Sequence, residues 1–325
     1  GAGMTMTALV QSSTAVTVAS IGFVNTGLLS LQNAMWVIFG SNVGTTLNAW
    51  LVAALGFSFR IDAFALPFVG IGAILMLAGR TLRQRALGQA LAGFGVLFLG
   101  IDALKDTFSG FGAAMNLQDH IAPGLVGWLI LVGIGTLLTV LMQASGAVIA
   151  IIITAAQGGL MSIEAACAMV IGTNIGTTST AILSALGATS NARRLAATHV
   201  IFNLVTGAVA IALLPLLISL LGALRNWFEQ PATPAVMLAM FHTAFNLLGV
   251  LLMVPLARPL RRFLAGHFRS REEEIARPRY LDAPSLAVPD LALRTLRLEL
   301  GRTQSFALTA LTAATRVPPD EPWIE

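Results

Sequence analysis

Two short polar segments, each set in apolar sequence, are the residues of this chain best suited to chemistry. They read Q-S-S-T and Q-A-S-G, and the polar side chains in them are Gln11, Ser12, Ser13, Thr14, Gln143 and Ser145. These hydroxyl and amide groups donate and accept hydrogen bonds without a formal charge. Beside backbone N–H groups, they could hold a partly dehydrated oxyanion without an arginine. The alternative is that they only hydrogen-bond neighbouring helices, as such residues often do in membranes.

A second pair of segments, G-S-N-V-G-T-T at 40–46 and G-T-N-I-G-T-T at 172–178, resembles a phosphate loop only superficially. Neither contains the lysine that a P-loop requires, so nucleotide binding is not expected. Backbone carbonyls freed at these glycines, with the threonine hydroxyls, would form a hard oxygen environment for a small cation. The residues expected to bind sodium or to support the site are Asn42, Thr45, Thr46, Asn174, Thr177 and Thr178. The alternative for Gly40 and Gly172 is a tight crossing of two helices.

A third repeated motif, H-x-x-F-N, occurs at His199–Asn203 and at His242–Asn246. Residues four apart lie on the same face of a helix. We therefore expect His199, Asn203, His242 and Asn246 to support the site from behind or to bind sodium. The alternative is a purely structural role. No spacing of Ser, His and Asp, no metal cluster and no pair of carboxylates points to catalysis, so the chain is not expected to be an enzyme.

These motifs recur because the chain contains one segment twice. When residues 1–54 are aligned on 133–186, at a constant offset of 132, 21 of the 54 positions are identical. Most identities fall on Gly, Asn, Gln, Ser and Thr. Two copies with so long a period indicate a duplicated half-protein. Duplication of the polar clusters favours a functional role for them over a merely structural one.

The composition is that of a membrane protein. Hydrophobic residues make up 56% of the chain and charged residues 10%, with a mean hydropathy of +0.82. Soluble domains carry about 25% charged residues. We therefore expect an all-α polytopic membrane protein. The isoelectric point of 10.5 indicates a basic cytoplasmic face and not nucleic-acid binding. The single cysteine, Cys167, permits no disulfide within the chain.

Apolar stretches that could span a bilayer are found at 61–79, 87–104, 196–221 and 235–257. The repeats differ, because polar residues and glycines interrupt them. Non-helical backbone is tolerated in a membrane only where it lines a cavity or is buried in protein. We therefore expect each repeat to form a re-entrant hairpin followed by a helix broken at its Asn-Gly segment.

The arginines predict the orientation of the chain. Short loops rich in Lys and Arg lie on the cytoplasmic side, and such loops are marked by Arg80, Arg83, Arg85, Arg193, Arg194, Arg258, Arg261 and Arg262. The end of the first repeat then lies outside and the end of the second inside. The two repeats are therefore expected to be inverted in the plasma membrane, with a cytoplasmic C-terminus.

Three regions are expected. They are a first transmembrane repeat at 1–80, a second with its following helices at 81–262, and a cytoplasmic tail at 263–325, in which 290–315 forms one amphipathic helix. The second copy is preceded by apolar segments that the first lacks. We therefore expect that an N-terminal membrane segment of the natural protein is missing from this chain.

The two motif pairs resemble those of the type II sodium/phosphate cotransporter family, which includes bacterial members. That family's signature is a pair of Q-S-S motifs, each followed by G-x-N-I-G-T-T. Over residues 1–260 this chain carries the similar segments Q-S-S and Q-A-S, followed by G-S-N-V-G-T-T and G-T-N-I-G-T-T. The resemblance implies inverted repeats with re-entrant hairpins, a homodimer, and sodium-driven uptake of inorganic phosphate. It places Gln11, Ser12, Ser13, Gln143 and Ser145 against phosphate. It also implies that the tail is the first helix of a PhoU-like cytoplasmic domain.

The second motif departs from the family pattern, because Ala144 and Gly146 replace hydroxyl residues. The expected mechanism is alternating access, with sodium ions as the coupling ions and no other cofactor. Secondary transporters with inverted repeats bind their substrates near the midplane, between the repeats. The alternatives are a transporter of another oxyanion such as arsenate or sulfate, a passive anion channel, and a membrane regulator that transports nothing.

Overall fold

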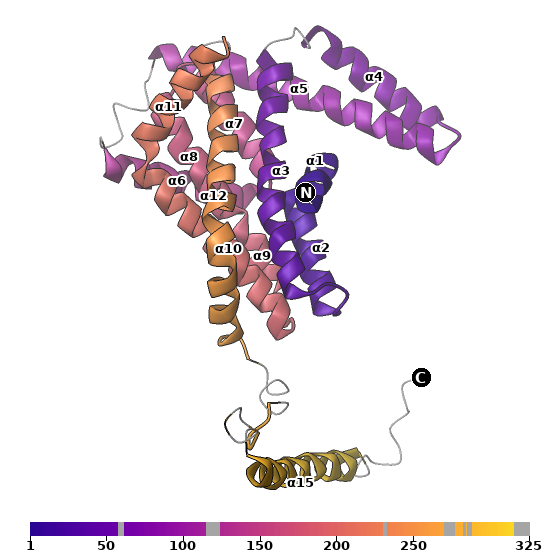
Figure 1. The fold of residues 1–325 in the computed structure, drawn as a ribbon. Helices are drawn as coiled ribbons and strands as arrows, with labels where there is room; N and C mark the ends of the chain where they lie inside the picture. The colour runs from indigo at the N-terminus through magenta and orange to yellow at the C-terminus, as the bar shows by residue number, and fades with distance from the viewer. Residues whose placement is uncertain are drawn as a thin grey trace. The chain divides into compact units, whose positions relative to one another are not determined.

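The computed structural model describes residues 1–57, 62–114, 124–229, 233–269, 277–281, 284 and 288–314 (Figure 1). These residues form helices and their connections, with no strand among them. The chain divides into two compact units, Gly1–Phe268 and Arg269–Glu325. The expected all-α architecture is confirmed.

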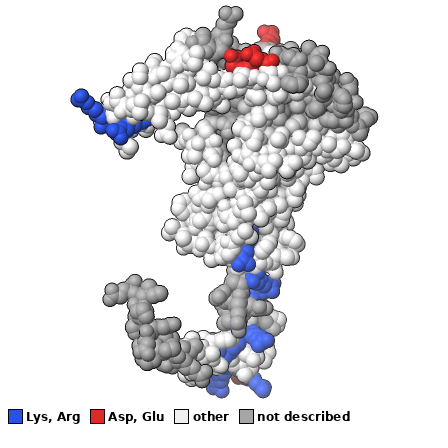
Figure 2. All heavy atoms as spheres, turned by 180° about the vertical axis from the view of Figure 1, so that it is seen from behind, with Lys and Arg blue, Asp and Glu red and all other residues white. Residues whose placement is uncertain are grey.

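Within the described residues, six helical segments are long and apolar enough to cross a bilayer. On the face that Figure 2 draws, the charged side chains of the first unit lie at its periphery, and most of the described surface between them is uncharged. The chain is therefore a polytopic membrane protein. The six segments are α3 (Leu31–Phe57), α5 (Leu82–Ala114), α6 (Leu125–Met142), α8 (Ile163–Gly176) continued by α9 (Thr178–Ser184), α10 (Ser190–Ala212) and α12 (Pro234–Ala265).

Shorter helices connect or precede these segments. They are α1 (Ala2–Val10), α2 (Ser13–Asn25), α4 (Asp62–Ala78), α7 (Ser145–Gln157) and α11 (Leu214–Trp227). The single span expected over 196–221 is wrong, because α10 ends at Ala212 and α11 begins at Leu214. Pro215 lies in the first turn of α11. Proline lacks an N–H group and is best accommodated there, so the chain starts a new helix.

The sequence repeat is also a repeat of local structure. Gln11 ends α1 in the left-handed conformation with φ 57°, and Gln143 ends α6 with φ 53°. Each is followed at once by a 13-residue helix, α2 or α7. Each of these helices ends in a turn with a glycine at positive φ, Gly27 at 77° and Gly159 at 76°. The inverted relation between the copies stays a prediction.

The helix break expected at the Asn-Gly segments is wrong for the first copy. There α3 runs without interruption through 40–46, and Asn42 Nδ2 donates to its own helix at Ile38 O, 2.9 Å away. In the second copy the helix is interrupted only at Thr177, between α8 and α9. In both copies the pronounced break lies earlier, at Gln11–Ser12 and at Gln143–Ala144.

The glycines of these segments serve close helix packing, which was the alternative for Gly40 and Gly172. A Cβ atom added to Gly40 would lie 3.1 Å from Met4 N, and one added to Gly172 would lie 2.2 Å from Val132 O. Small residues let the backbones of α3 and α8 approach α1 and α6. Close packing therefore explains these glycines, and neither α3 nor α8 opens at them.

Helices α10 and α12 pack against α3 of the first copy and α8 of the second. The ring of Phe39 on α3 stacks on Phe202 of α10 with centroids 5.1 Å apart. Trp50 Nε1 of α3 donates to Thr243 Oγ1 of α12 at 2.9 Å. These contacts fix the helices that carry the repeated motifs.

The second unit contains α15 (Pro289–Ala314), which agrees with the helix expected over 290–315. Glu299 of this helix accepts hydrogen bonds from the backbone N–H groups of Arg279, at 2.8 Å, and Tyr280, at 3.0 Å. It also pairs with Arg302. Desolvation raises the pKa of Glu299, but the N–H group of Tyr280, the guanidinium of Arg302 and the N–H group of Arg279 outweigh it and hold that pKa below its usual value.

Candidate functional site

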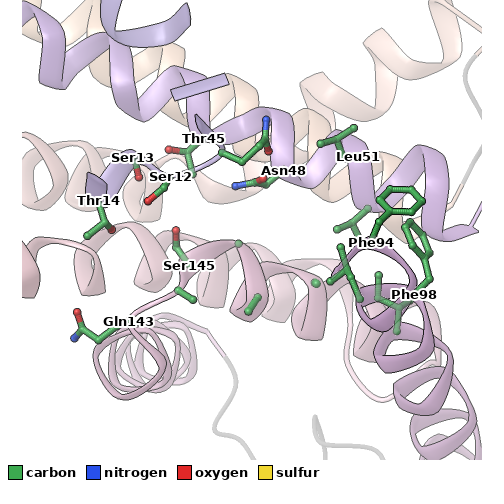
Figure 3. A pocket seen from close by; sticks show the side chains of 18 residues that line it. Ser12, Ser13, Thr14, Thr45, Asn48, Leu51, Phe94, Phe98, Gln143 and Ser145 are labelled. Carbon is green, nitrogen blue, oxygen red and sulfur yellow. The ribbon is translucent and has the colours of Figure 1, made fainter. Parts of the chain in front are cut away.

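One pocket of about 470 Å³ brings the two polar motifs together (Figure 3). Residues 143–146 are 132 positions from residues 11–14, yet both segments line it. Figure 3 shows the hydroxyl of Ser145 pointing toward Ser12. All six residues expected to bind the substrate line this pocket, namely Gln11, Ser12, Ser13, Thr14, Gln143 and Ser145.

The pocket lies at the N-termini of α2 and α7. The first N–H groups of a helix lack partners within that helix, and the helix dipole places partial positive charge there. In α2, Ser12 Oγ accepts a hydrogen bond from Ala15 N at 3.1 Å. In α7 the capping position is Ala144, which makes no side-chain hydrogen bond. The first turn of α7 therefore retains N–H groups that no side chain caps.

The two glutamines hold the helix breaks in place. Gln11 Nε2 donates to Ala8 O, and Gln143 Nε2 donates to Val140 O at 2.6 Å, each at the end of the preceding helix. Gln143 Oε1 also accepts a hydrogen bond from Thr180 Oγ1 of α9. These bonds give both amides a role in shaping the pocket.

The hydroxyls of Ser13, Thr14 and Ser145 are free to meet a ligand. Ser13 is 9% exposed and Ser145 8% exposed, so they lie in a largely dehydrated setting. Neither they nor Thr14 hydrogen-bond through their hydroxyls to any residue that the structure describes. A ligand oxygen in the pocket could therefore accept from all three.

Apart from Thr45, the far wall of the pocket was not anticipated. Helix α3 contributes Thr45, Asn48, Leu51 and Val52, and α5 contributes the apolar side chains Phe94, Leu97, Phe98 and Ile101. Among the described residues that line the pocket, none is charged. The cavity is therefore polar at the helix N-termini and at Thr45 and Asn48 of α3, and apolar along α5.

Most residues expected to bind sodium or to support the site lie outside this pocket. Of the ten, only Thr45 lines it. The other nine are buried in the protein interior, namely Asn42, Thr46, Asn174, Thr177, Thr178, His199, Asn203, His242 and Asn246.

The second H-x-x-F-N motif forms a hydrogen-bond network with α8, although His242 Nδ1 is buried and makes no hydrogen bond within the described part of the chain. Asn174 Nδ2 donates to Asn246 Oδ1 at 2.8 Å, and His242 Nε2 lies 3.2 Å from Asn174 Oδ1. Asn246 Nδ2 donates to the backbone of His242 at 2.8 Å. This network fixes α8, a helix of the second copy, to α12.

The first H-x-x-F-N motif is less satisfied. Asn203 Nδ2 donates to His199 O at 3.0 Å. Asn203 Oδ1 and His199 Nδ1 are buried and make no hydrogen bond within the described part of the chain. Buried polar atoms without partners are uncommon and call for an explanation, such as an ion or a water molecule.

No group of three or more His, Cys, Asp and Glu side chains lies together among the described residues. A resident transition-metal site of that kind is therefore not seen in the described part of the structure.

Comparison with known proteins identifies a family and several relatives that the chain resembles. The sequence model of a family described as "Na+/Pi-cotransporter" matches residues 1–106 and 116–254. The chain is 30% identical, over 295 residues, to YjbB of Escherichia coli (strain K12), for which inorganic phosphate export is proposed in its name. That alignment covers 90% of this chain and 52% of YjbB, so the chain spans about half the length of this relative.

Two further relatives differ in coverage. The "Uncharacterized protein YqeW" of Bacillus subtilis (strain 168) is 29% identical over 262 residues, which are 79% of this chain and 80% of that protein. "Sodium-dependent phosphate transport protein 2A" of Oryctolagus cuniculus is 38% identical over 68 residues, 21% of this chain and 10% of that protein. No solved structure matches the chain.

Proposed function

The chain belongs to the Na+/Pi-cotransporter family, and from this premise we propose that it is a symporter that carries inorganic phosphate across the plasma membrane together with sodium. The observation that carries this proposal is the convergence of the two polar motifs, one from each copy, on a single uncharged pocket. Phosphate would bind between them, held by Ser12, Ser13, Thr14 and Ser145.

The chemistry of the pocket suits a tetrahedral oxyanion. Free hydroxyls and the N-termini of α2 and α7 converge on it, and both kinds of group donate hydrogen bonds to anions. The volume of about 470 Å³ accommodates such a small anion with water. A site without arginine binds an anion by many weak donors, which favours release over tight retention.

The absence of charge among the described lining residues supports coupling to a cation. Placing an anion in a poorly hydrated cavity is costly unless an opposite charge enters with it. Thr45 Oγ1 donates to Ser41 O at 3.1 Å, so its lone pairs remain available to sodium at the pocket wall. The buried Asn203 Oδ1, which accepts no hydrogen bond from the residues that the structure describes, is a second candidate ligand. The remaining Asn, Thr and His residues of the repeated motifs would support these positions.

The duplicated architecture supports alternating access. Each copy brings its own helix break and its own 13-residue helix to the pocket. We propose that the copies are inverted, that one bundle rocks against the other around the bound ions, and that the protein works as a homodimer with its C-terminus in the cytoplasm.

The direction of transport follows from the ion gradients in a symporter. An inward sodium gradient would drive phosphate uptake, which is the direction we propose. The name of the relative YjbB offers export as the second candidate. Export would be favoured by an outward driving force or by coupling to another ion.

The test is radiolabelled phosphate flux in proteoliposomes that contain the purified chain. We expect accumulation against a concentration gradient when sodium is directed inward, and none when choline replaces sodium. Sodium-independent, dissipative flux would identify a channel, whereas competition by arsenate or sulfate stronger than by phosphate would identify another oxyanion as substrate. Efflux from loaded vesicles without sodium, faster than uptake under any sodium gradient, would favour an exporter. No flux of any oxyanion would contradict a transport function and leave a regulatory role.

A further inference from the structure

The second polar motif lacks two hydroxyls that the first one has. The offset of 132 residues pairs Ser12 with Ala144 and Thr14 with Gly146. Only Ser145 therefore brings a side-chain hydroxyl to the pocket from the second motif. An anion held evenly from both sides would need another donor on that side.

The side chain of Asn48 occupies the space beside Gly146. A Cβ atom built on Gly146 would lie 3.1 Å from Asn48 Nδ2, 3.4 Å from Cγ and 3.8 Å from Cβ. The amide of α3 thus packs directly against the first turn of α7, and Figure 3 shows Asn48 above that helix. A serine or threonine at position 146 would compete with it for this space.

The side-chain amide of Asn48 is available to bind a ligand. It lines the pocket, is partly buried, and makes no hydrogen bond to any residue that the structure describes. The amides of Asn42, Asn174, Asn203 and Asn246, in contrast, all donate to a neighbouring backbone or side-chain oxygen. Asn48 Nδ2 therefore offers two N–H donors to whatever enters the pocket.

We propose that Asn48 is a substrate-binding residue: it reaches from the first copy to the hydroxyl-poor second motif and donates its amide to the bound oxyanion, with Gly146 providing the clearance. This rests on the proposed function, since it requires an oxyanion in the pocket. The amide replaces the donor that a hydroxyl at position 146 would supply. Asn48 and Gly146 thus form one unit, and changing either alone weakens the site.

The first test is the concentration dependence of phosphate uptake in proteoliposomes. N48A should raise the KM for phosphate about tenfold or more with little change in kcat, because it removes a donor to a charged ligand. The double variant N48A/G146S should recover most of that loss, since truncation makes room for the new hydroxyl. G146S alone should also raise KM, because its side chain displaces Asn48. N33A, on an exposed position of the same helix, is the matched control and should behave as wild type.

The second test reports occupancy of the pocket without relying on transport. Cys167, the single native cysteine, is fully buried, so a thiol reagent should label N48C selectively. Phosphate should slow this labelling in a concentration-dependent way. The labelling rates are compared in phosphate, arsenate, sulfate and chloride.

The two tests separate failure of the inference from failure of the proposed function. If the wild type takes up phosphate but N48A leaves KM within about twofold, or N48A/G146S is no better than N48A, the inference is overturned and the transport proposal stands. If the wild type takes up no phosphate yet an oxyanion protects N48C, the subsite is supported and the transport proposal fails. Absence of both uptake and protection overturns both.

Discussion

Asn174 of α8 donates a hydrogen bond from Nδ2 to Oδ1 of Asn246 on α12, across 2.8 Å in the protein interior. This contact joins the Asn-Gly segment of the second copy to the second H-x-x-F-N motif, two features that stand 72 residues apart in the sequence. His242 completes the network through Asn174 Oδ1. Side-chain hydrogen bonds are stronger in a setting of low dielectric than in water, and a donor or acceptor that loses its partner there is costly.

Removal of Asn246 should therefore destabilise the membrane unit. N246A leaves Asn174 Nδ2 without its acceptor, and we expect a loss of about 1–3 kcal/mol in the free energy of unfolding. The measurement is thermal unfolding of the purified protein in detergent. N226A, an exposed position on α11, is the control. Equal melting temperatures for N246A and the control would show that the network does not stabilise the fold.

Because α6 and α8 approach closely, we expect two glycines of α6 to differ sharply in how well they tolerate substitution by alanine. A Cβ on Gly135 would lie 2.2 Å from Met169 O, whereas one on Gly133 would meet no atom within 4 Å. G135A should force the helices apart and lower the yield of monodisperse protein severely, while G133A should be tolerated. Size-exclusion profiles after identical expression provide the measurement. Similar profiles for the two variants would mean that the helices do not cross as described.

Glu299 predicts a pH-dependent contact in the C-terminal unit. Its pKa is lowered in the folded state, so the stability that it contributes is present above the unfolded pKa and is lost as pH falls through the folded pKa. The N–H groups of Arg279 and Tyr280, which donate to Glu299, should be protected from hydrogen exchange at neutral pH and lose protection as the pH falls below the ordinary pKa of a glutamate, after correction for intrinsic rates. E299Q should reduce the protection at neutral pH. Protection that is the same in E299Q and wild type at every pH would contradict this assignment.

The sequence predicts the polar side of the pocket well, because identical polar residues recur at a constant offset in apolar surroundings. Gln11 and Gln143 mark the two helix breaks, and the segments that follow them meet. The apolar side could not be predicted. Phe94 and Phe98 lie on α5, outside both copies, and nothing in their apolar context distinguishes them from residues that face lipid or core.

The helix break expected at the Asn-Gly segment of the first copy is wrong for a physical reason. Glycine permits both an opened backbone and a close helix crossing, and the sequence does not show which neighbour is near. The structure brings α1 against Gly40, so the clearance is used for packing. The difference in hydrogen bonding between the two H-x-x-F-N motifs could not be predicted either, because it depends on which asparagine of another helix lies opposite each motif.

The most direct test of the central claim, that both motifs hold one phosphate, is sodium-driven phosphate uptake by S13A and S145A at graded phosphate concentrations. Each serine is more than nine-tenths buried at the pocket and comes from a different copy. Each substitution should raise the KM for phosphate by about tenfold. S219A, on the exposed surface of α11, should match wild type. Wild-type KM in both S13A and S145A would contradict the account, because neither copy would then contact the anion through its motif serine.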